Sequence, residues 1–309
     1  MTDREEPTSN DAQTSTPEAI PTPELTALTH PAEGVPSVVT DTTGLAEVIA
    51  ALTQGTGPIA IDAERAGGYR YSHSAYLVQL RRTGSGSHLI DPIGFTDLAP
   101  LAEVIADEEW ILHAASQDLP CLAELQMLPT RLFDTEMAAR ILGRPKVGLA
   151  ALAESELGVS LAKEHSAADW STRPLPEAWL RYATLDVELL IELRSILAED
   201  LESTGRMPWA VEEFEFLRTA PARAPRVDPW RRTSGIHKVR TARGLEIARQ
   251  LWQARDAMAQ QRDIAPGRVL PDAAIAAAAA ARPTTRAQLG ARPAFSGRGT
   301  KRRIDFWWQ

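Results

Sequence analysis

Two carboxylates directly after a buried strand are the first residues of this chain whose types and spacing could do chemistry. Ile59-Ala60-Ile61 is typical of a short buried strand, and Asp62-Ala63-Glu64 follows it without a break. Alternation along a strand directs Asp62 and Glu64 to one face, where adjacent carboxylates repel each other. A divalent cation that prefers hard oxygen ligands, Mg²⁺ or Mn²⁺, relieves that repulsion. The alternative is an exposed strand end with two solvated acids.

The spacing Asp-x-Glu does not identify this pair by itself, because it occurs six times in the chain. Its context does. Asp3/Glu5 lies in a polar N-terminal segment and Asp107/Glu109 in a polar loop, whereas Asp62/Glu64 alone directly follows a predicted buried strand. The surroundings therefore favour this pair as the chemical one.

Tyr182 and Asp186 form a second candidate pair, within a helix predicted from about Pro176 to Glu202. Residues four apart share one face of a helix, and with only four tyrosines in the chain this spacing is rarely met by chance. A phenol beside a metal-bound carboxylate can hold an attacking water and help to deprotonate it. The alternative is a core-facing tyrosine that bonds a neighbouring aspartate.

A third candidate segment is His113-Ala-Ala-Ser-Gln-Asp118. A strand is predicted to end at His113, and Asp118 falls in the first turn of the next helix. An acid at that position is also what the helix dipole favours, so capping is the alternative role for Asp118.

The elements that must position these residues predict an α/β fold. Short strands are expected at 37–40, 59–61, 75–80, 88–91 and 110–112, with helices near 45–52, 98–106 and 117–128. Helices dominate after Asp134. A mixed sheet with flanking helices is the layer architecture that this order favours.

Charge divides the 309 residues into two parts. From Pro221 onward there are 18 Lys and Arg against 6 Asp and Glu, a net of +12, and the preceding residues hold 15 against 35, a net of −20. We expect a disordered tail at 1–36, an acidic α/β domain at 37–220, a Pro- and Arg-rich linker at 221–235 and a small all-helical domain at 236–309.

Composition excludes several classes of protein. No run approaches the about 18 apolar residues of a membrane helix, and the N-terminus lacks a secretory pattern. The one cysteine, Cys121, excludes an internal disulfide framework and is typical of a small buried hydrophobe. A cytoplasmic protein without a membrane partner is expected.

Taken in chain order, Asp62-x-Glu64, Asp118 and Tyr182-x₃-Asp186 resemble the DEDDy 3′–5′ exonucleases. Within that group, His113-Ala-Ala-Ser-Gln-Asp118-Leu and Asp169-Trp170-Ser-Thr-Arg173-Pro174-Leu175 resemble the ribonuclease D family. Residues 245–272, with Pro266-Gly267-Arg268-Val269-Leu270-Pro271, resemble the HRDC domain that follows the nuclease there. The resemblance covers about residues 37–309.

The resemblance implies a ribonuclease H-like fold and two divalent metal ions, Mg²⁺ or Mn²⁺. It assigns the metal-binding role to Asp62, Glu64, Asp118 and Asp186, with Asp62 bridging both ions, and it assigns Tyr182 to orienting the attacking water. The implied reaction removes nucleoside 5′-monophosphates from RNA 3′ ends, and the implied substrates are tRNA precursors or other structured RNA. The sequence gives no indication of the oligomeric state.

Weaker expectations concern substrate contacts. Arg65, His113 and Trp170 are candidates, Trp170 by stacking on a terminal base, although core packing is the alternative for this tryptophan. Lys163 and Arg173 could touch phosphate or be solvated.

Two features depart from the family pattern. Arg65 occupies a position where an aromatic or aliphatic residue is usual. The chain also ends at Phe306-Trp307-Trp308-Gln309, three aromatics expected to be exposed, where an HRDC domain ordinarily continues through another helix. A fragment or an unusually short relative is therefore expected.

The basic C-terminal part is expected to bind the phosphate backbone in a salt-sensitive way. Its candidate contacts are Arg231, Arg232, His237, Lys238, Arg240, Arg243, Lys301, Arg302 and Arg303. Two alternatives to an exoribonuclease stay open at this point, namely a 3′–5′ DNA exonuclease with the same site and a catalytically inactive RNA-binding protein of the same fold. A stand-alone interaction module would leave the motifs unexplained.

Overall fold

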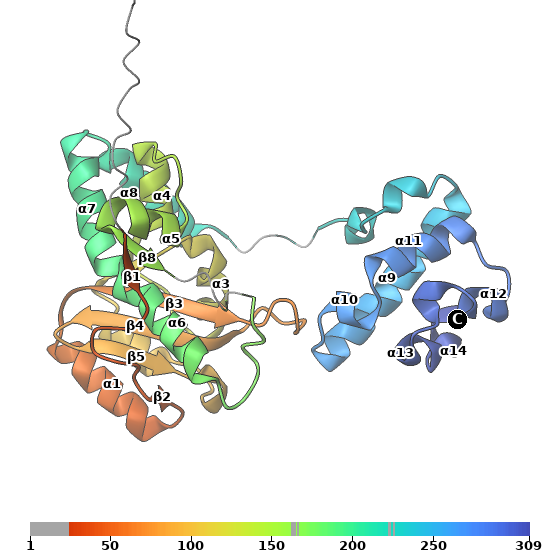
Figure 1. The fold of residues 1–309 in the computed structure, drawn as a ribbon, viewed down its shortest axis with the longest axis horizontal. Helices are drawn as coiled ribbons and strands as arrows, with labels where there is room; N and C mark the ends of the chain where they lie inside the picture. Colours follow the sequence, from red (N-terminus) through yellow and green to blue (C-terminus); the bar gives the residue numbers. More distant parts are fainter. Residues whose placement is uncertain (1–24, 162–164, 166, 222–223, 225) are drawn as a thin grey trace, which may run out of the picture.

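The computed structural model describes residues 25–161, 165, 167–221, 224 and 226–309. It shows an α/β unit followed by an all-helical unit (Figure 1), so the predicted fold class is confirmed. The strands are β1 Thr26–Leu28, β2 Val38–Val39, β3 Thr56–Arg65, β4 Ala75–Thr83, β5 Gly86–Ile90, β6 Glu109–Leu112, β7 Arg131–Asp134 and β8 Val159–Leu161.

Helices flank these strands and make up the second unit. Those of the α/β unit are α1 Thr42–Gln54, α2 Ala99–Val104, α3 Leu119–Glu124, α4 Thr135–Leu142, α5 Leu149–Leu152, α6 Glu177–Glu188, α7 Leu190–Ser203 and α8 Met207–Thr219. Those of the second unit are α9 Ala242–Arg262, α10 Pro266–Val269, α11 Asp272–Ala281, α12 Arg286–Gly290, α13 Arg298–Lys301 and α14 Ile304–Trp308.

The main sheet has the strand order β2-β5-β4-β3-β6-β7. Its central strand β3 pairs antiparallel with β4 and parallel with β6. In the β3–β4 register, Asp62 lies opposite Gln79 and Glu64 opposite Leu77. The two acids therefore end a central strand on one face of the sheet, as alternation predicts.

Apolar side chains cover both faces of this sheet. Ile59 and Ile61 point to the face covered by α1, where Leu52 packs in the same core. On the opposite face, α6 packs across β3, β4 and β5, and Ala183 lies among Leu77, Leu89 and Trp170 there. Helix α6 thus brings its polar residues over the end of β3.

Two predicted helices have different bounds in the structure. The single helix predicted over 176–202 is two consecutive helices, α6 and α7, joined at the buried Leu189. Helix α1 begins before the predicted range of 45–52, directly after Asp41, whose carboxylate accepts a hydrogen bond from the Gly44 N–H at 2.9 Å.

Strand β1 lies within the range expected to lack regular structure. It pairs in parallel with β8, and the Ala32 N–H donates to Glu188 at 3.0 Å. The prediction that order begins at residue 37 is therefore wrong, because this polar segment gains its hydrogen bonds from elements more than 130 residues away in sequence. Residues 1–24 of the predicted tail lie outside the described residues.

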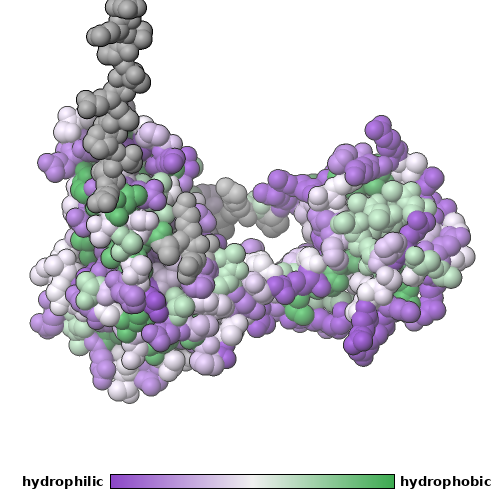
Figure 2. Space-filling model, viewed as in Figure 1, coloured by the Kyte–Doolittle hydropathy of each residue, from purple (hydrophilic) through white to green (hydrophobic). Residues whose placement is uncertain are grey.

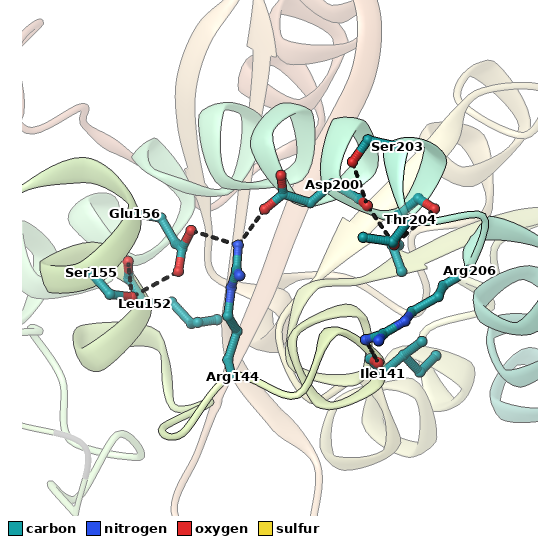
Figure 3. A network of polar contacts seen from close by, with 10 residues as sticks. Ile141, Arg144, Leu152, Ser155, Glu156, Asp200, Ser203, Thr204 and Arg206 are labelled. Carbon is teal, nitrogen blue, oxygen red and sulfur yellow. Dashed lines mark hydrogen bonds and ion pairs between the residues drawn. The ribbon is translucent and has the colours of Figure 1, made fainter.

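Polar contacts join α4, α7 and the segments that follow them (Figure 3). Arg144 donates to Glu156 at 3.0 Å and also bonds Asp200 of α7. Arg206 donates to the carbonyl of Ile141 in α4 at 2.9 Å. These bonds add polar contacts between helices that also share the apolar core of the α/β unit.

The C-terminal unit has its own apolar core, built on α9 and α11. Trp230 and Trp307 are buried in it, at 5% exposure each. The placement of Trp230 in a linker that extends to residue 235 is therefore wrong, as is the expectation that Trp307 is exposed. Phe306 and Trp308 are exposed as predicted, at 40% and 39%. On the face shown in Figure 2, strongly hydrophilic residues rim a paler, weakly hydrophobic area of this unit.

The loop between β3 and β4 contacts the C-terminal unit near α10 (Figure 1). The carboxylate of Asp263, at the end of α9, accepts hydrogen bonds from the N–H groups of Tyr71 and Ser72 at 3.1 and 2.8 Å. Arg268 donates to the Gly68 carbonyl at 2.8 Å, and its guanidinium lies 4.0 Å from the centre of the Tyr69 ring. The loop that follows β3 is thus also the contact between the units.

None of the described helices is long and apolar enough to cross a membrane.

Candidate active site

The three predicted segments converge on one cavity of about 400 Å³. The end of β3, the start of α3 and the middle of α6 contribute its polar wall. All five predicted catalytic residues line it, together with two of the three weaker candidates: Asp62, Glu64, Asp118, Tyr182, Asp186, Arg65 and His113.

Three of the carboxylates are close enough to share one cation. Asp62, Glu64 and Asp186 each offer an oxygen, and these oxygens lie within 4.8 Å of one another. A donor set made only of carboxylate oxygens suits a hard divalent ion. The arrangement therefore fits a divalent metal on chemical grounds, with two ligands from one strand and one from a helix.

Burial and mutual repulsion act on these acids. Burial raises the pKa of Glu64 well above its usual value, and the charges of Asp62, Asp186 and Asp118 raise it further. Burial likewise raises the pKa of Asp62 and, together with the charge of Asp62, the pKa of Asp186. A cation would reverse this, because it favours the charged carboxylates.

Asp118 lies at the N-cap of α3, where a capping role was the alternative. Its side chain makes no capping hydrogen bond. It is 4% exposed, and burial followed by the charge of Asp62 raises its pKa well above the usual value. One oxygen lies 3.4 Å from the guanidinium of Arg65. Asp118 therefore faces the other acids, outside the closest group of three.

Tyr182 and Asp186 lie one turn apart on α6, as their spacing predicts. The tyrosine hydroxyl donates a hydrogen bond to the Asp186 carboxylate. Burial, then the charges of Asp186 and Glu64, raise the pKa of Tyr182 above its ordinary value. The phenol is therefore a neutral donor at the rim of the acidic group.

Asp134 holds the segment between His113 and Asp118, and the sequence analysis did not single it out. Its carboxylate accepts hydrogen bonds from Ala114 N–H at 3.2 Å, Ala115 N–H at 2.8 Å and Met137 N–H at 3.0 Å. It is 2% exposed. The available signal was an Asp placed between the apolar pair Leu132-Phe133 and a predicted helical region, which is the usual capping position.

His113 lines the cavity and is held by the Thr135 hydroxyl, 2.9 Å from its Nδ1. Burial lowers its pKa below the ordinary value, against the opposing charge of Asp134. His113 is therefore a neutral imidazole near the acids at pH 7.

The structure corrects the prediction for Trp170. The side chain is fully buried beneath α6 and packs against Trp179 with ring centroids 5.4 Å apart. It does not line the cavity and cannot stack on a base there, so core packing, the alternative, is correct.

Arg173 has a structural role, and neither phosphate contact nor solvation describes it. Its guanidinium pairs with both oxygens of Asp91, at 2.5 and 2.8 Å, and donates to the carbonyl of Tyr76 at 2.7 Å. These bonds tie the segment before α6 to β4. Lys163 lies outside the described residues.

With this geometry established, comparisons with known proteins agree with it. Residues 36–202 match the family model described as a 3′-5′ exonuclease, and residues 244–309 match the HRDC domain. The exonuclease model covers the cavity and every residue assigned to it. The class that fold and site define is therefore a 3′–5′ exonuclease.

Individual relatives narrow the class. Ribonuclease D of Jannaschia sp. is 35% identical over 270 residues, which cover 83% of this chain and 68% of that protein. Ribonuclease D of Escherichia coli is 35% identical over 215 residues, 67% of this chain and 56% of that protein. The chain belongs to the ribonuclease D family and carries an HRDC domain after its exonuclease domain.

Solved structures agree. A crystal structure of a protein from Bifidobacterium adolescentis matches with a TM-score of 0.85 and 41% identity, over 92% of this chain and 73% of that one. Escherichia coli RNase D, described as an exoribonuclease involved in structured RNA processing, matches with a TM-score of 0.66 and 30% identity, over 88% and 74%. The chain thus spans between about half and three quarters of these relatives' length.

Proposed function

We propose that this protein is a metal-dependent 3′–5′ exoribonuclease that releases nucleoside 5′-monophosphates from RNA 3′ ends. The observation that carries the proposal is the convergence of Asp62, Glu64 and Asp186 within 4.8 Å, with Asp118 and Tyr182 lining the same cavity. Family membership supports the same reaction. The named activity of the relatives supports RNA over DNA.

We propose that Asp62, Glu64, Asp118 and Asp186 hold two divalent ions, Mg²⁺ or Mn²⁺. Bound at these carboxylates, the two ions supply the positive charge that activates a water and stabilises the leaving 3′-oxygen. Asp62, adjacent to both Asp186 and Asp118, is the proposed shared ligand. The charge of the ions also explains how an acidic cavity accepts a phosphodiester.

The chain's own residues then orient the attacking water. Tyr182, fixed by its bond to Asp186, orients the water through its hydroxyl. Neutral His113 can donate or accept one hydrogen bond at the cavity wall. Both side chains act in these roles as neutral groups held in place by hydrogen bonds.

Arg65 is proposed as the phosphate contact. Among the described residues that line the cavity, it is the only Lys or Arg, and its side chain is 30% exposed. It also lines an adjoining hollow of about 290 Å³ beside Gly67 and Gly68. Its place between the two hollows suits a phosphate of the nucleotide next to the one being removed.

The helical unit is proposed to supply affinity for structured RNA such as tRNA precursors. A net charge of +12 from Pro221 onward suits contact with a phosphate backbone and predicts salt-sensitive binding. We propose residues 37–220, extended by β1, as the nuclease domain, and a basic domain that begins by Trp230.

A gel assay tests the proposal. The substrates are a 5′-labelled single-stranded RNA with a 3′-hydroxyl and the DNA oligomer of the same sequence, each with Mg²⁺, Mn²⁺ or EDTA. The expected result is a ladder that shortens from the 3′ end of RNA, needs metal and is absent in Asp186→Ala.

The other outcomes separate the alternatives. Equal trimming of DNA would make the protein a general 3′–5′ exonuclease. RNA binding by the wild type without any trimming would overturn the enzyme and leave an inactive RNA-binding protein.

A further inference from the structure

Gln79 is a fully buried polar residue that the proposed reaction does not use. It lies in the middle of β4 with 0% exposure. Neither its Oε1 nor its Nε2 has a hydrogen-bond partner among the described residues. Burial of an unpaired amide destabilises a fold, and a methionine or leucine would fill this place without that cost. We therefore expect Gln79 to have a functional role that offsets this loss of stability.

The register of the sheet places Gln79 directly beside the metal site. It is the cross-strand partner of Asp62 in the antiparallel β3–β4 pair. Side chains of such partners point to the same face, with Cβ atoms about 4.5–5.5 Å apart. The amide of a glutamine can span that separation to a neighbouring carboxylate.

Apolar side chains also lie beside Gln79 on this face. Its partner on β5 is Leu89, and Leu77 lies two residues before it on the same face. Leu77 and Leu89 pack with Ala183 of α6 and with Trp170. The indole Nε1 of Trp170 is a second buried polar atom without a partner among the described residues.

These two unpaired side chains and Asp62 have complementary hydrogen-bonding groups. An indole can only donate, a glutamine amide both accepts and donates, and a carboxylate accepts. A series of hydrogen bonds, donated by Trp170 to Gln79 and by Gln79 to Asp62, would give all three side chains a partner.

We propose that Gln79 is the positioning residue of the metal site. Neither bond is formed among the described residues; in the ion-bound protein the Gln79 Nε2–H donates to an oxygen of the Asp62 carboxylate and orients that carboxylate, while its Oε1 accepts from the Trp170 indole. Residues that donate or accept a hydrogen bond with a metal ligand fix the orientation of that ligand, and their loss typically weakens metal binding about 10- to 100-fold. The inference rests on the proposed function, because it assumes that Asp62 binds divalent ions.

The test measures Mn²⁺ binding to the full chain by calorimetry after treatment with EDTA and dialysis. The variants are Gln79→Met, which keeps the length of the side chain, and Gln79→Leu, which packs differently and keeps the test open if the first does not fold. Val78→Ala is the matched control, since Val78 is equally buried on the same strand but faces the opposite core.

Both Gln79 variants are expected to bind Mn²⁺ about 10- to 100-fold more weakly, with a melting temperature in EDTA at or above that of the wild type. Their RNA cleavage is expected to fall at low Mn²⁺ and recover as Mn²⁺ is raised. Val78→Ala is expected to lower the melting temperature and leave Mn²⁺ affinity unchanged.

Three results would overturn the inference in distinguishable ways. Unchanged Mn²⁺ affinity in a folded Gln79 variant would remove the positioning role and leave the proposed nuclease intact. Equal losses in Val78→Ala would show that general packing of β4 sets the affinity. No Mn²⁺ binding by the wild type would overturn the metal site and this inference with it.

Discussion

Replacement of Asp263 is expected to loosen the contact between the two units. Asp263 is the C-cap of α9, and its backbone adopts the left-handed conformation, with φ of 46°. Its carboxylate receives the N–H groups of Tyr71 and Ser72, and the guanidinium of Arg70 lies 4.0 Å away. Although burial opposes it, the bonds from Ser72 and Tyr71 hold the pKa of Asp263 below its usual value. Asp263→Ala removes these interactions, and Asp263→Asn removes the charge while tolerating the same backbone.

The size of the effect follows from the two backbone bonds. Each hydrogen bond contributes a net of about 0.5–1.5 kcal/mol, and the Asp263 side chain is 41% exposed, which favours the lower half of that range. Roughly 1–2 kcal/mol in total corresponds to a change of about 5- to 30-fold in the equilibrium between docked and separated units.

Amide hydrogen exchange of the loop after β3 measures this change. Exchange at Tyr71 and Ser72 is expected to accelerate about 5- to 30-fold in Asp263→Ala, and less in Asp263→Asn. Asp305→Ala is the control, since Asp305 pairs with Arg286 on the far side of the C-terminal unit's core. Unchanged exchange in Asp263→Ala would refute the assignment of these bonds as the anchor.

Three further predictions concern the acids and the basic surface. Burial and neighbouring charge raise the pKa of Asp186, so its charged form destabilises the ion-free fold as pH rises above about 4. Asp186→Asn should therefore have a higher melting temperature than the wild type in EDTA, and this difference should grow with pH. The difference should vanish in Mn²⁺, because the ion stabilises a wild type that binds it. A margin that shrinks with pH would contradict this. Tyr182→Phe should lower kcat by about 10²- to 10⁴-fold with Mn²⁺ affinity within a few-fold of the wild type, and a proportional loss of both would assign Tyr182 to metal binding instead. Joint replacement of the exposed Lys301 and Arg302 by Gln should reduce the slope of log Kd for single-stranded RNA against log salt by about 1.4, and an unchanged slope would exclude them from the interface.

The acids could be predicted from the sequence because local periodicity decides where they point. Alternation along β3 places Asp62 and Glu64 on one face, and a single helical turn separates Tyr182 from Asp186. Neither statement needs knowledge of distant residues. The convergence of these segments came from the family resemblance, since chain order alone does not say which segments meet.

The errors share one cause, which is dependence on partners far away in the sequence. Arg173 is structural because Asp91 lies beside it, 82 residues earlier, and Trp170 is buried because α6 covers it. Strand β1 exists because β8 pairs with it. Gln79 gave no signal either, since a glutamine in a strand reveals its burial and lack of partners only in the folded protein.

Anomalous diffraction from crystals soaked in Mn²⁺ tests the central claim most directly, because it locates the ions without relying on turnover. The account predicts one peak among the carboxylates of Asp62, Glu64 and Asp186 and a second between Asp62 and Asp118, both absent in crystals of Asp62→Asn. Peaks confined to other surface acids, with none inside this cavity, would contradict the assignment of these four carboxylates as the metal centre.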